Sequence, residues 1–158
     1  MIKIGDKIPA ILGKDQDGNE ITAEGLKGNK VILYFYPKDN TSGCTAQACS
    51  LRDGIADLKA AGYIVIGVSK DSAKSHIKFR DQHSLPFALI ADTDTELNQA
   101  FGVWVEKSMY GRKYMGTERT TFVIDEEGIV RAIVSGKEVD TKEHARQLLE
   151  MISKLDKE

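Results

Sequence analysis

Two long apolar runs, separated by enough chain for one helix, are the feature that most restricts how this sequence can fold. The runs are VILYFY (Val31–Tyr36) and YIVIGVS (Tyr63–Ser69), and neither alternates with charged residues. Continuous runs of this kind are typical of strands buried on both faces. The intervening stretch from Gly43 to Ala61 has apolar residues at helical spacing, and Gly62 ends it. The pattern predicts two strands of one sheet, joined by a helix.

Further elements extend this unit along the chain. The pattern predicts a helix from about Ser72 to Gln82, a strand at Phe87–Asp92, a short helix within residues 93–102, a β-hairpin of TTFVID and IVRAIV across EEG, and a helix from Thr141 to Leu155. Before the first run, KDQDGNEI centres on Asp17-Gly18, which is a hairpin-type turn signal. The order predicts an α/β chain with a central mixed sheet flanked by helices and an N-terminal β-hairpin extension. The thioredoxin-like arrangement fits this order best.

Composition limits the cellular compartment and the classes of partner that we expect. With 158 residues, of which 41% are hydrophobic and 29% charged, the sequence predicts one globular domain over residues 1–158 that needs no disulfide to fold. The net charge of −2 gives no electrostatic reason to expect a nucleic acid or an anionic membrane as partner. We find no secretory signal at the start and no apolar stretch of roughly 20 residues. We therefore expect a reducing cytoplasm, where a close cysteine pair is more often catalytic or metal-binding than structural.

The segment PKDNTSGCTAQAC (Pro37–Cys49) contains both cysteines of the chain. Cys44 lies in the first turn of the predicted helix, where unpaired N–H groups and the helix dipole favour negative charge. Because the thiolate is the nucleophilic form of cysteine, this position favours a reactive sulfur. We expect Thr41 to direct its hydroxyl at that sulfur and Pro37 to shield one side of the pocket from water. A cation that completes the pocket has to come from elsewhere in the chain.

Helical geometry keeps the two thiols apart. Cys44 heads the inward stripe that continues through Ala48, Leu51, Ile55 and Leu58. Cys49 would lie about 140° around the helix and about 7.5 Å further along it, which separates the two Cα atoms by about 8.6 Å. A disulfide needs a separation below roughly 7 Å. The two cysteines can therefore bond only if the first turns of the helix unwind.

The residues alone leave a structural, a metal-binding and a redox role open for the cysteine pair. Zinc normally needs four ligands in two close pairs, whereas His76, His83 and His144 are scattered through the chain and are expected to be solvated side chains. General disulfide oxidoreductases usually have the spacing C-x-x-C, and here it is C-x₄-C. A thiol-exchange protein and a non-enzymatic module with inert cysteines therefore stand beside any enzymatic interpretation.

Longer motifs resemble one known family. PKDNTSGC resembles the peroxiredoxin signature, which is Pro, three residues, Thr or Ser, two residues and then the reactive Cys. FYPKDNTSGCTAQACSLRD, together with FGVW and RTTFVID, resembles the branch of bacterioferritin comigratory protein, or peroxiredoxin Q, and the similarity extends over essentially the whole chain. The sequence differs at Ser42, where many members have Pro. This change loosens the loop but removes no reacting group.

The resemblance implies a thiol-dependent peroxidase of thioredoxin-like fold, active in antioxidant defence, without a metal or other cofactor. Cys44 would attack the hydroperoxide, and Cys49 would resolve the product as a Cys44–Cys49 disulfide. Arg119, just before TFVID, would supply the missing cation, with Thr41 and Pro37 in the same pocket. The implied partners are a hydroperoxide substrate and thioredoxin or a similar dithiol reductant. Because the resolving thiol is in the same chain, we expect a monomer.

Overall fold

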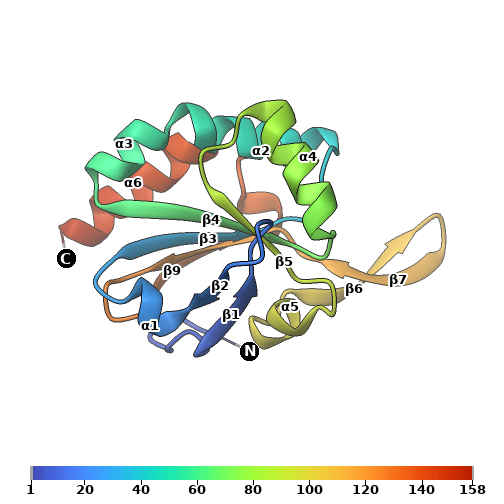
Figure 1. Ribbon diagram of the computed structural model, residues 1–158, viewed down its shortest axis with the longest axis horizontal. Helices are drawn as coiled ribbons and strands as arrows, with labels where there is room; N and C mark the ends of the chain where they lie inside the picture. Colours follow the sequence, from blue (N-terminus) through green and yellow to red (C-terminus); the bar gives the residue numbers. More distant parts are fainter. Residues whose placement is uncertain (1, 158) are drawn as a thin grey trace.

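A five-stranded mixed sheet forms the centre of the computed structural model, which describes residues 2–157. Its strands are β3 (Lys30–Phe35), β4 (Tyr63–Ser69), β5 (Ala88–Ala91), β8 (Thr120–Ile124) and β9 (Val130–Ser135), in the order β5-β4-β3-β8-β9. Strands β3, β4 and β5 are parallel, and β8 and β9 are antiparallel to their neighbours. The predicted mixed sheet is confirmed, and β3 is its central strand (Figure 1).

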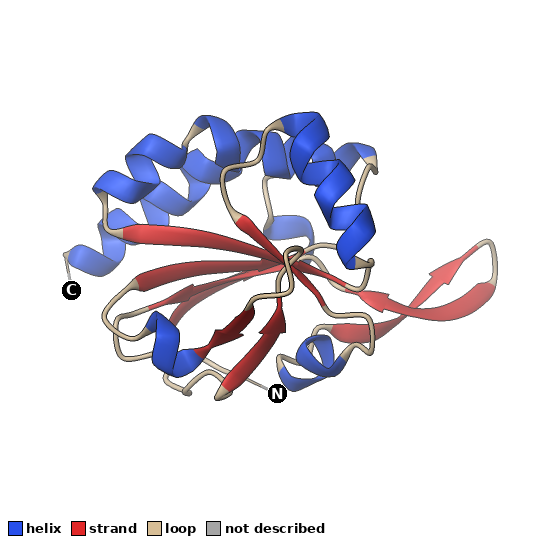
Figure 2. Cartoon of the chain, viewed as in Figure 1, coloured by secondary structure: helices blue, strands red, loops and turns tan. Residues whose placement is uncertain are grey.

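Helices cover one face of this sheet, and smaller elements cover the other (Figure 2). The first face carries α2 (Ser42–Asp53), α3 (Ile55–Ala60), α4 (Ala73–His83) and α6 (His144–Asp156). On the opposite side lie β1 (Ile11–Lys14), β2 (Glu20–Thr22), α1 (Ala23–Leu26) and α5 (Glu96–Ala100). A 3₁₀ turn, η1 (Gly136–Glu138), follows β9. Among residues 2–157, no helix has both the length and the apolar character that crossing a membrane requires.

Strand β3 is buried from Val31 onward because it contributes to two separate cores. Ile32 and Tyr34 pack with residues of α2, α4 and α6 in one core. The alternate residues, Val31, Leu33 and Phe35, pack with β1, α5 and β8 in the other core. Side chains of a strand alternate between the two faces of its sheet, so a central strand covered on both faces has no polar position. The run from Val31 to Tyr36 is accordingly at most 1% exposed.

The predicted helix over residues 43–61 is two helices, because the chain turns at Gly54. This residue ends α2 and precedes α3, with φ of −94° and ψ of 7°. A Cβ atom at Gly54 would overlap the side chain of Ala145 on α6. Glycine therefore lets the corner between α2 and α3 pack directly against α6. The apolar spacing continues through the corner, which explains why periodicity alone indicated a single helix.

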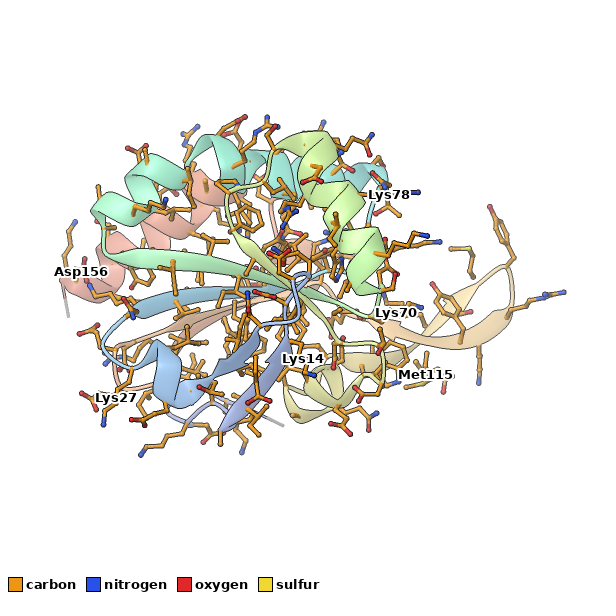
Figure 3. All side chains as sticks on the ribbon, viewed as in Figure 1. Lys14, Lys27, Lys70, Lys78, Met115 and Asp156 are labelled. Atoms are coloured by element: carbon orange, nitrogen blue, oxygen red, sulfur yellow. The ribbon has the colours of Figure 1, made fainter. Side chains whose placement is uncertain are left out.

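The strands β6 (Trp104–Met109) and β7 (Arg112–Thr117) form a hairpin that the sequence did not predict. It projects beyond the body of the molecule (Figure 1), and Met115 on it is labelled in Figure 3. Its turn consists of Tyr110 and Gly111, both with positive φ. Most of its outer side chains are exposed, so these strands lack the apolar run that marks β3 and β4. The other predicted elements are confirmed, including the β1–β2 hairpin around Asp17-Gly18 and the β8–β9 hairpin.

The prediction that the histidines are solvated was wrong for two of the three. His76 and His144 are fully buried, because each has polar partners in the core, and His83 is partly buried. His144 lies between Thr121 Oγ1, at 2.8 Å from Nε2, and Gln147 Oε1, at 2.9 Å from Nδ1. A neutral ring satisfies both partners when Nδ1 donates to Gln147 and Nε2 accepts from Thr121. Burial lowers the pKa of His144 to about 4.

His144 should make the fold sensitive to acid. Because its pKa falls from 6.5 to about 4 on folding, the unfolded chain binds the proton first as the pH decreases. The free energy of unfolding therefore has its full value above about pH 6.5 and decreases toward pH 4, by about 3 kcal/mol in total for this residue. We expect His144→Asn to be less stable than the parent at pH 7.5 but to lose less stability between pH 7 and pH 4.5. Urea unfolding of both proteins across this range measures the difference, and parallel pH curves would contradict the assignment.

Candidate active site

Cys44 lies at the start of α2, where the chain leaves the carboxyl end of β3 and turns back over the sheet. Its side chain is buried, with 1% exposed, in the same core as Ala48, Leu51 and Leu58. The predicted position at the head of the inward face is therefore confirmed. Thr41 is the N-cap residue, but its side chain makes no capping hydrogen bond. The first N–H groups of α2 thus have no intrahelical or capping acceptor, and they point out of the end of the helix that carries Cys44.

Arg119 brings a cation to this sulfur from a distant part of the chain. It lies between β7 and β8, and its Nη2 donates to Cys44 Sγ at 3.4 Å. Its Nη1 donates to Gln47 Oε1 at 2.7 Å, and Gln47 is fully buried one turn after Cys44. A Cβ atom on Gly43 would lie 3.2 Å from Arg119 Nη2, so the glycine leaves room for the guanidinium. The structure brings together the cysteine and the arginine that the motif indicated and adds Gln47, which the sequence analysis missed.

Cys49 lies in a different environment on the same helix. Both cysteines are free thiols, and Cys49 is partly exposed whereas Cys44 is buried. Its Sγ lies 3.9 Å from Nδ1 of His83, the last residue of α4. Helix α2 is continuous from Ser42 to Asp53, so helical geometry places the two cysteine Cα atoms about 8.6 Å apart. Within residues 2–157, no group of three or more His, Cys, Asp or Glu side chains is arranged to hold a metal ion.

The loop between β3 and α2 places Thr41 differently from expectation. Pro37 is partly buried two residues after the end of β3, and its role in shielding the pocket stays a prediction. Thr41 is exposed, and its hydroxyl donates to the carbonyl of Lys38 at 3.0 Å and not to the Cys44 sulfur. Asn40, with φ of 62°, turns the chain so that this carbonyl comes within reach. The prediction that Thr41 donates to the sulfur is therefore wrong for this conformation.

Comparison with known proteins identifies the family. Residues 4–133 match the AhpC/TSA family. The chain is 47% identical over 139 residues to a putative peroxiredoxin bcp of Coxiella burnetii, covering 88% of this chain and 92% of the relative. It is 42% identical over 151 residues to peroxiredoxin Bcp of Bacillus subtilis, covering 96% and 95%. The chain belongs to the AhpC/TSA family.

Solved structures agree with this assignment. A cysteine-to-serine mutant of PrxQ from Xylella fastidiosa superimposes with a TM-score of 0.89 at 29% identity, covering 99% of this chain and 98% of that one. The bacterioferritin comigratory protein of Xanthomonas campestris gives a TM-score of 0.86 at 31% identity, covering 97% and 99%. The predicted resemblance to the Bcp and peroxiredoxin Q branch, and the thioredoxin-like fold, are confirmed. This peroxiredoxin is accordingly a thiol-dependent peroxidase.

The surroundings of Cys44 in this peroxiredoxin favour negative charge on the sulfur. The Arg119 guanidinium and the N-terminus of α2 both stabilise an anion there. Lys107 on β6 is a second cation of the region, and burial, followed by the charge of nearby Arg119, lowers the pKa of Lys107. Burial and the neighbouring Cys44 raise the pKa of Tyr34, so that phenol stays neutral beside the thiol. The site therefore combines positive charge with a buried apolar wall.

A buried carboxylate anchors the loop that leads to Cys44, and the sequence analysis missed it. Asp39 accepts hydrogen bonds from the hydroxyl of Tyr36 at 2.6 Å and from Ser75 Oγ at 2.7 Å. Its backbone N–H donates to Asp71 Oδ2 at 2.8 Å. His76 Nδ1 lies 2.7 Å from Asp39 Oδ2. These contacts fasten the loop to α4 and to the segment after β4.

His76 pairs with Asp39 in this network through Nδ1, and its other ring nitrogen lies 3.1 Å from the carbonyl oxygen of Ile90. Burial alone would raise the pKa of Asp39, but hydrogen bonds from His76 and Tyr36 outweigh it and hold that pKa below its ordinary value. Three of the groups that hold the loop before Cys44, namely Asp71, Ser75 and His76, are more than 30 residues from Asp39, so the local sequence does not reveal them.

Loss of the guanidinium should slow the reaction of Cys44 with peroxide. We expect Arg119→Met to lower the second-order rate constant with hydrogen peroxide by about 10² or more, since it removes a charged donor at the reacting atom. Rapid mixing, acid quench and mass spectrometry of the Cys44 thiol measure this rate. Arg112→Met, an exposed arginine on β7, is the matched control and should keep the parent rate. Equal rates in the two variants would contradict the assignment of Arg119 to the site.

Proposed function

We propose that this peroxiredoxin reduces hydrogen peroxide and organic hydroperoxides through Cys44 as the attacking thiolate and Cys49 as the resolving thiol. The observation that carries the proposal is the 3.4 Å contact between Arg119 Nη2 and the buried Cys44 Sγ at the uncapped N-terminus of α2. A general thiol-exchange protein needs a sulfur that a partner protein can reach, whereas Cys44 is only 1% exposed.

In the first step, the Cys44 thiolate attacks one oxygen of the hydroperoxide. A sulfur–oxygen bond forms, the oxygen–oxygen bond breaks, and water or an alcohol leaves after taking up a proton, so that Cys44 becomes a sulfenic acid. Arg119 stabilises the thiolate and binds the peroxide oxygens, and the N–H of Cys44 donates to the developing charge. The lone pairs of the Thr41 hydroxyl accept the O–H of the peroxide. Pro37 shields the pocket from water.

In the second step, Cys49 attacks the sulfenic sulfur. The product is a Cys44–Cys49 disulfide and water. Because α2 keeps the two Cα atoms about 8.6 Å apart, the first turns of the helix unwind before the sulfurs meet. The disulfide is therefore an intermediate of turnover, which an external dithiol reduces by exchange.

The reductant we propose is thioredoxin or a similar dithiol protein, and the setting is a reducing cytoplasm. A resolving cysteine in the same chain makes a second subunit unnecessary, so we propose a monomer. The substrate range is supported by the Xanthomonas campestris bacterioferritin comigratory protein, whose structural study concerns alkyl peroxide reduction. Antioxidant defence is the role that this chemistry serves.

Single cysteine variants test the proposal. We expect Cys44→Ser to abolish peroxide consumption in an assay coupled to thioredoxin, thioredoxin reductase and NADPH. Cys49→Ser should still react once with peroxide, because Cys44 and Arg119 remain, but it should accumulate sulfenic and then sulfinic acid. Intact-mass spectrometry after one equivalent of peroxide distinguishes these products from the disulfide of the parent. Sustained turnover by Cys44→Ser, or no disulfide in the parent, would overturn the proposal.

A further inference from the structure

His83 is the only histidine side chain within residues 2–157 that lies against a cysteine sulfur. The mechanism above assigns it no role. Its Nδ1 is 3.9 Å from Cys49 Sγ, which is at the long end of the range for a hydrogen bond with sulfur. Catalytic contacts are often long in the resting enzyme and shorten along the reaction. The contact places the thiol of the second step beside an imidazole, which is a side chain that can act as a proton acceptor.

His83 is held in place through its backbone and through its ring. Its backbone carbonyl accepts a hydrogen bond from Arg52 Nη1 at 2.8 Å, and Arg52 follows Cys49 by one helical turn. Its ring packs edge-on against Phe79, one turn earlier in α4, at 5.2 Å between ring centres. Ser84, with φ of 51°, ends α4 directly after it. These contacts tie the end of α4 to the second half of α2, so the ring stays next to Cys49.

A resolving thiol has a chemical need that this arrangement meets. Only the thiolate attacks a sulfenic sulfur efficiently, and an unassisted thiol with pKa near 8.5 is mostly protonated at neutral pH. Arg119 and the N-terminus of α2 act on Cys44 and lie at the other end of this stretch of helix. The group that lies beside the Cys49 sulfur is His83.

We propose that His83 is the general base for the resolving step, a role that rests on the function proposed above. Neutral His83 accepts the Cys49 thiol proton at Nδ1. The thiolate then attacks the Cys44 sulfenic sulfur, a sulfur–sulfur bond forms, and the sulfur–oxygen bond breaks. The departing hydroxide takes up the proton that the imidazolium releases, directly or through solvent, and becomes water. Thiol and sulfenic acid give disulfide and water, without a further reactant.

Other charged or titratable groups surround the pair. From α2, Arg52 faces His83 and lies close to Cys49, and Asp53 is paired with Arg52. From α4, Arg80 precedes His83 by one turn and is paired with Asp81. From β3, Tyr34 lies near Cys49 and stays a neutral phenol because burial raises its pKa. Since Arg52 and Arg80 are each paired with a carboxylate, His83 is the group of this set that is placed to accept a proton from Cys49.

The test separates the two chemical steps in His83→Gln. Rapid mixing with one equivalent of hydrogen peroxide, followed by acid quench and mass spectrometry, gives the rate of sulfenic acid formation and then the rate of disulfide formation. We expect the first rate to match the parent and the second to fall at least about tenfold at pH 7. Lys78→Gln, an exposed neighbour on α4, is the matched control and should keep both rates.

The pH dependence separates proton transfer from a structural role. In the parent, the rate of disulfide formation should level off at a lower pH than in His83→Gln, because only the parent has a base beside Cys49. In His83→Gln the rate should still be rising over the pH range in which the parent has levelled off. A disulfide rate and pH profile in His83→Gln equal to those of the parent would overturn this inference alone. Absence of any Cys44–Cys49 disulfide in the parent would overturn the proposed function as well.

Discussion

The helical backbone of α2 keeps the two sulfurs of this peroxiredoxin apart, and the arrangement of the site depends on that separation. The first turn places Cys44 in the core, against the guanidinium of Arg119. The next turn places Cys49 at a partly exposed position beside His83. One short helix therefore provides two different electrostatic environments. In the mechanism we propose, Arg119 serves the thiol that attacks the peroxide, and His83 serves the thiol that resolves the product.

The same helix is built to open at one end only. The side chain of its N-cap residue makes no capping hydrogen bond, and a missing cap reduces helix stability by about 1 kcal/mol. A helix of 12 residues is marginal by itself and depends on tertiary packing. Its second half is fixed by Arg52, which bonds the end of α4, and by the corner at Gly54 against α6. Local opening of the first turns is thus the least costly motion that brings the sulfurs together.

The sequence predicted the parts of the structure that leave a local signal. The apolar runs indicated β3 and β4, and the motif around Cys44 together with the arginine before β8 indicated the two groups that meet at the site. Polar contacts between distant segments leave no such signal. Gln47, the Asp39–His76 pair and the contact of Cys49 with His83 depend on partners that only the folded chain brings together. For the same reason, the sequence does not reveal that His76 and His144 are buried.

Amide hydrogen exchange of α2 tests the central claim, which is that disulfide formation requires the first turns of this helix to unwind. The exchange is compared between the reduced protein and the Cys44–Cys49 disulfide form. Mass spectrometry measures it in peptides from Gly43 to Leu51, and a peptide from β4 is the internal reference. The account predicts that protection from Gly43 to Leu51 is lost in the disulfide form while protection of β4 is unchanged. Equal protection of residues 43–51 in the two forms would contradict it.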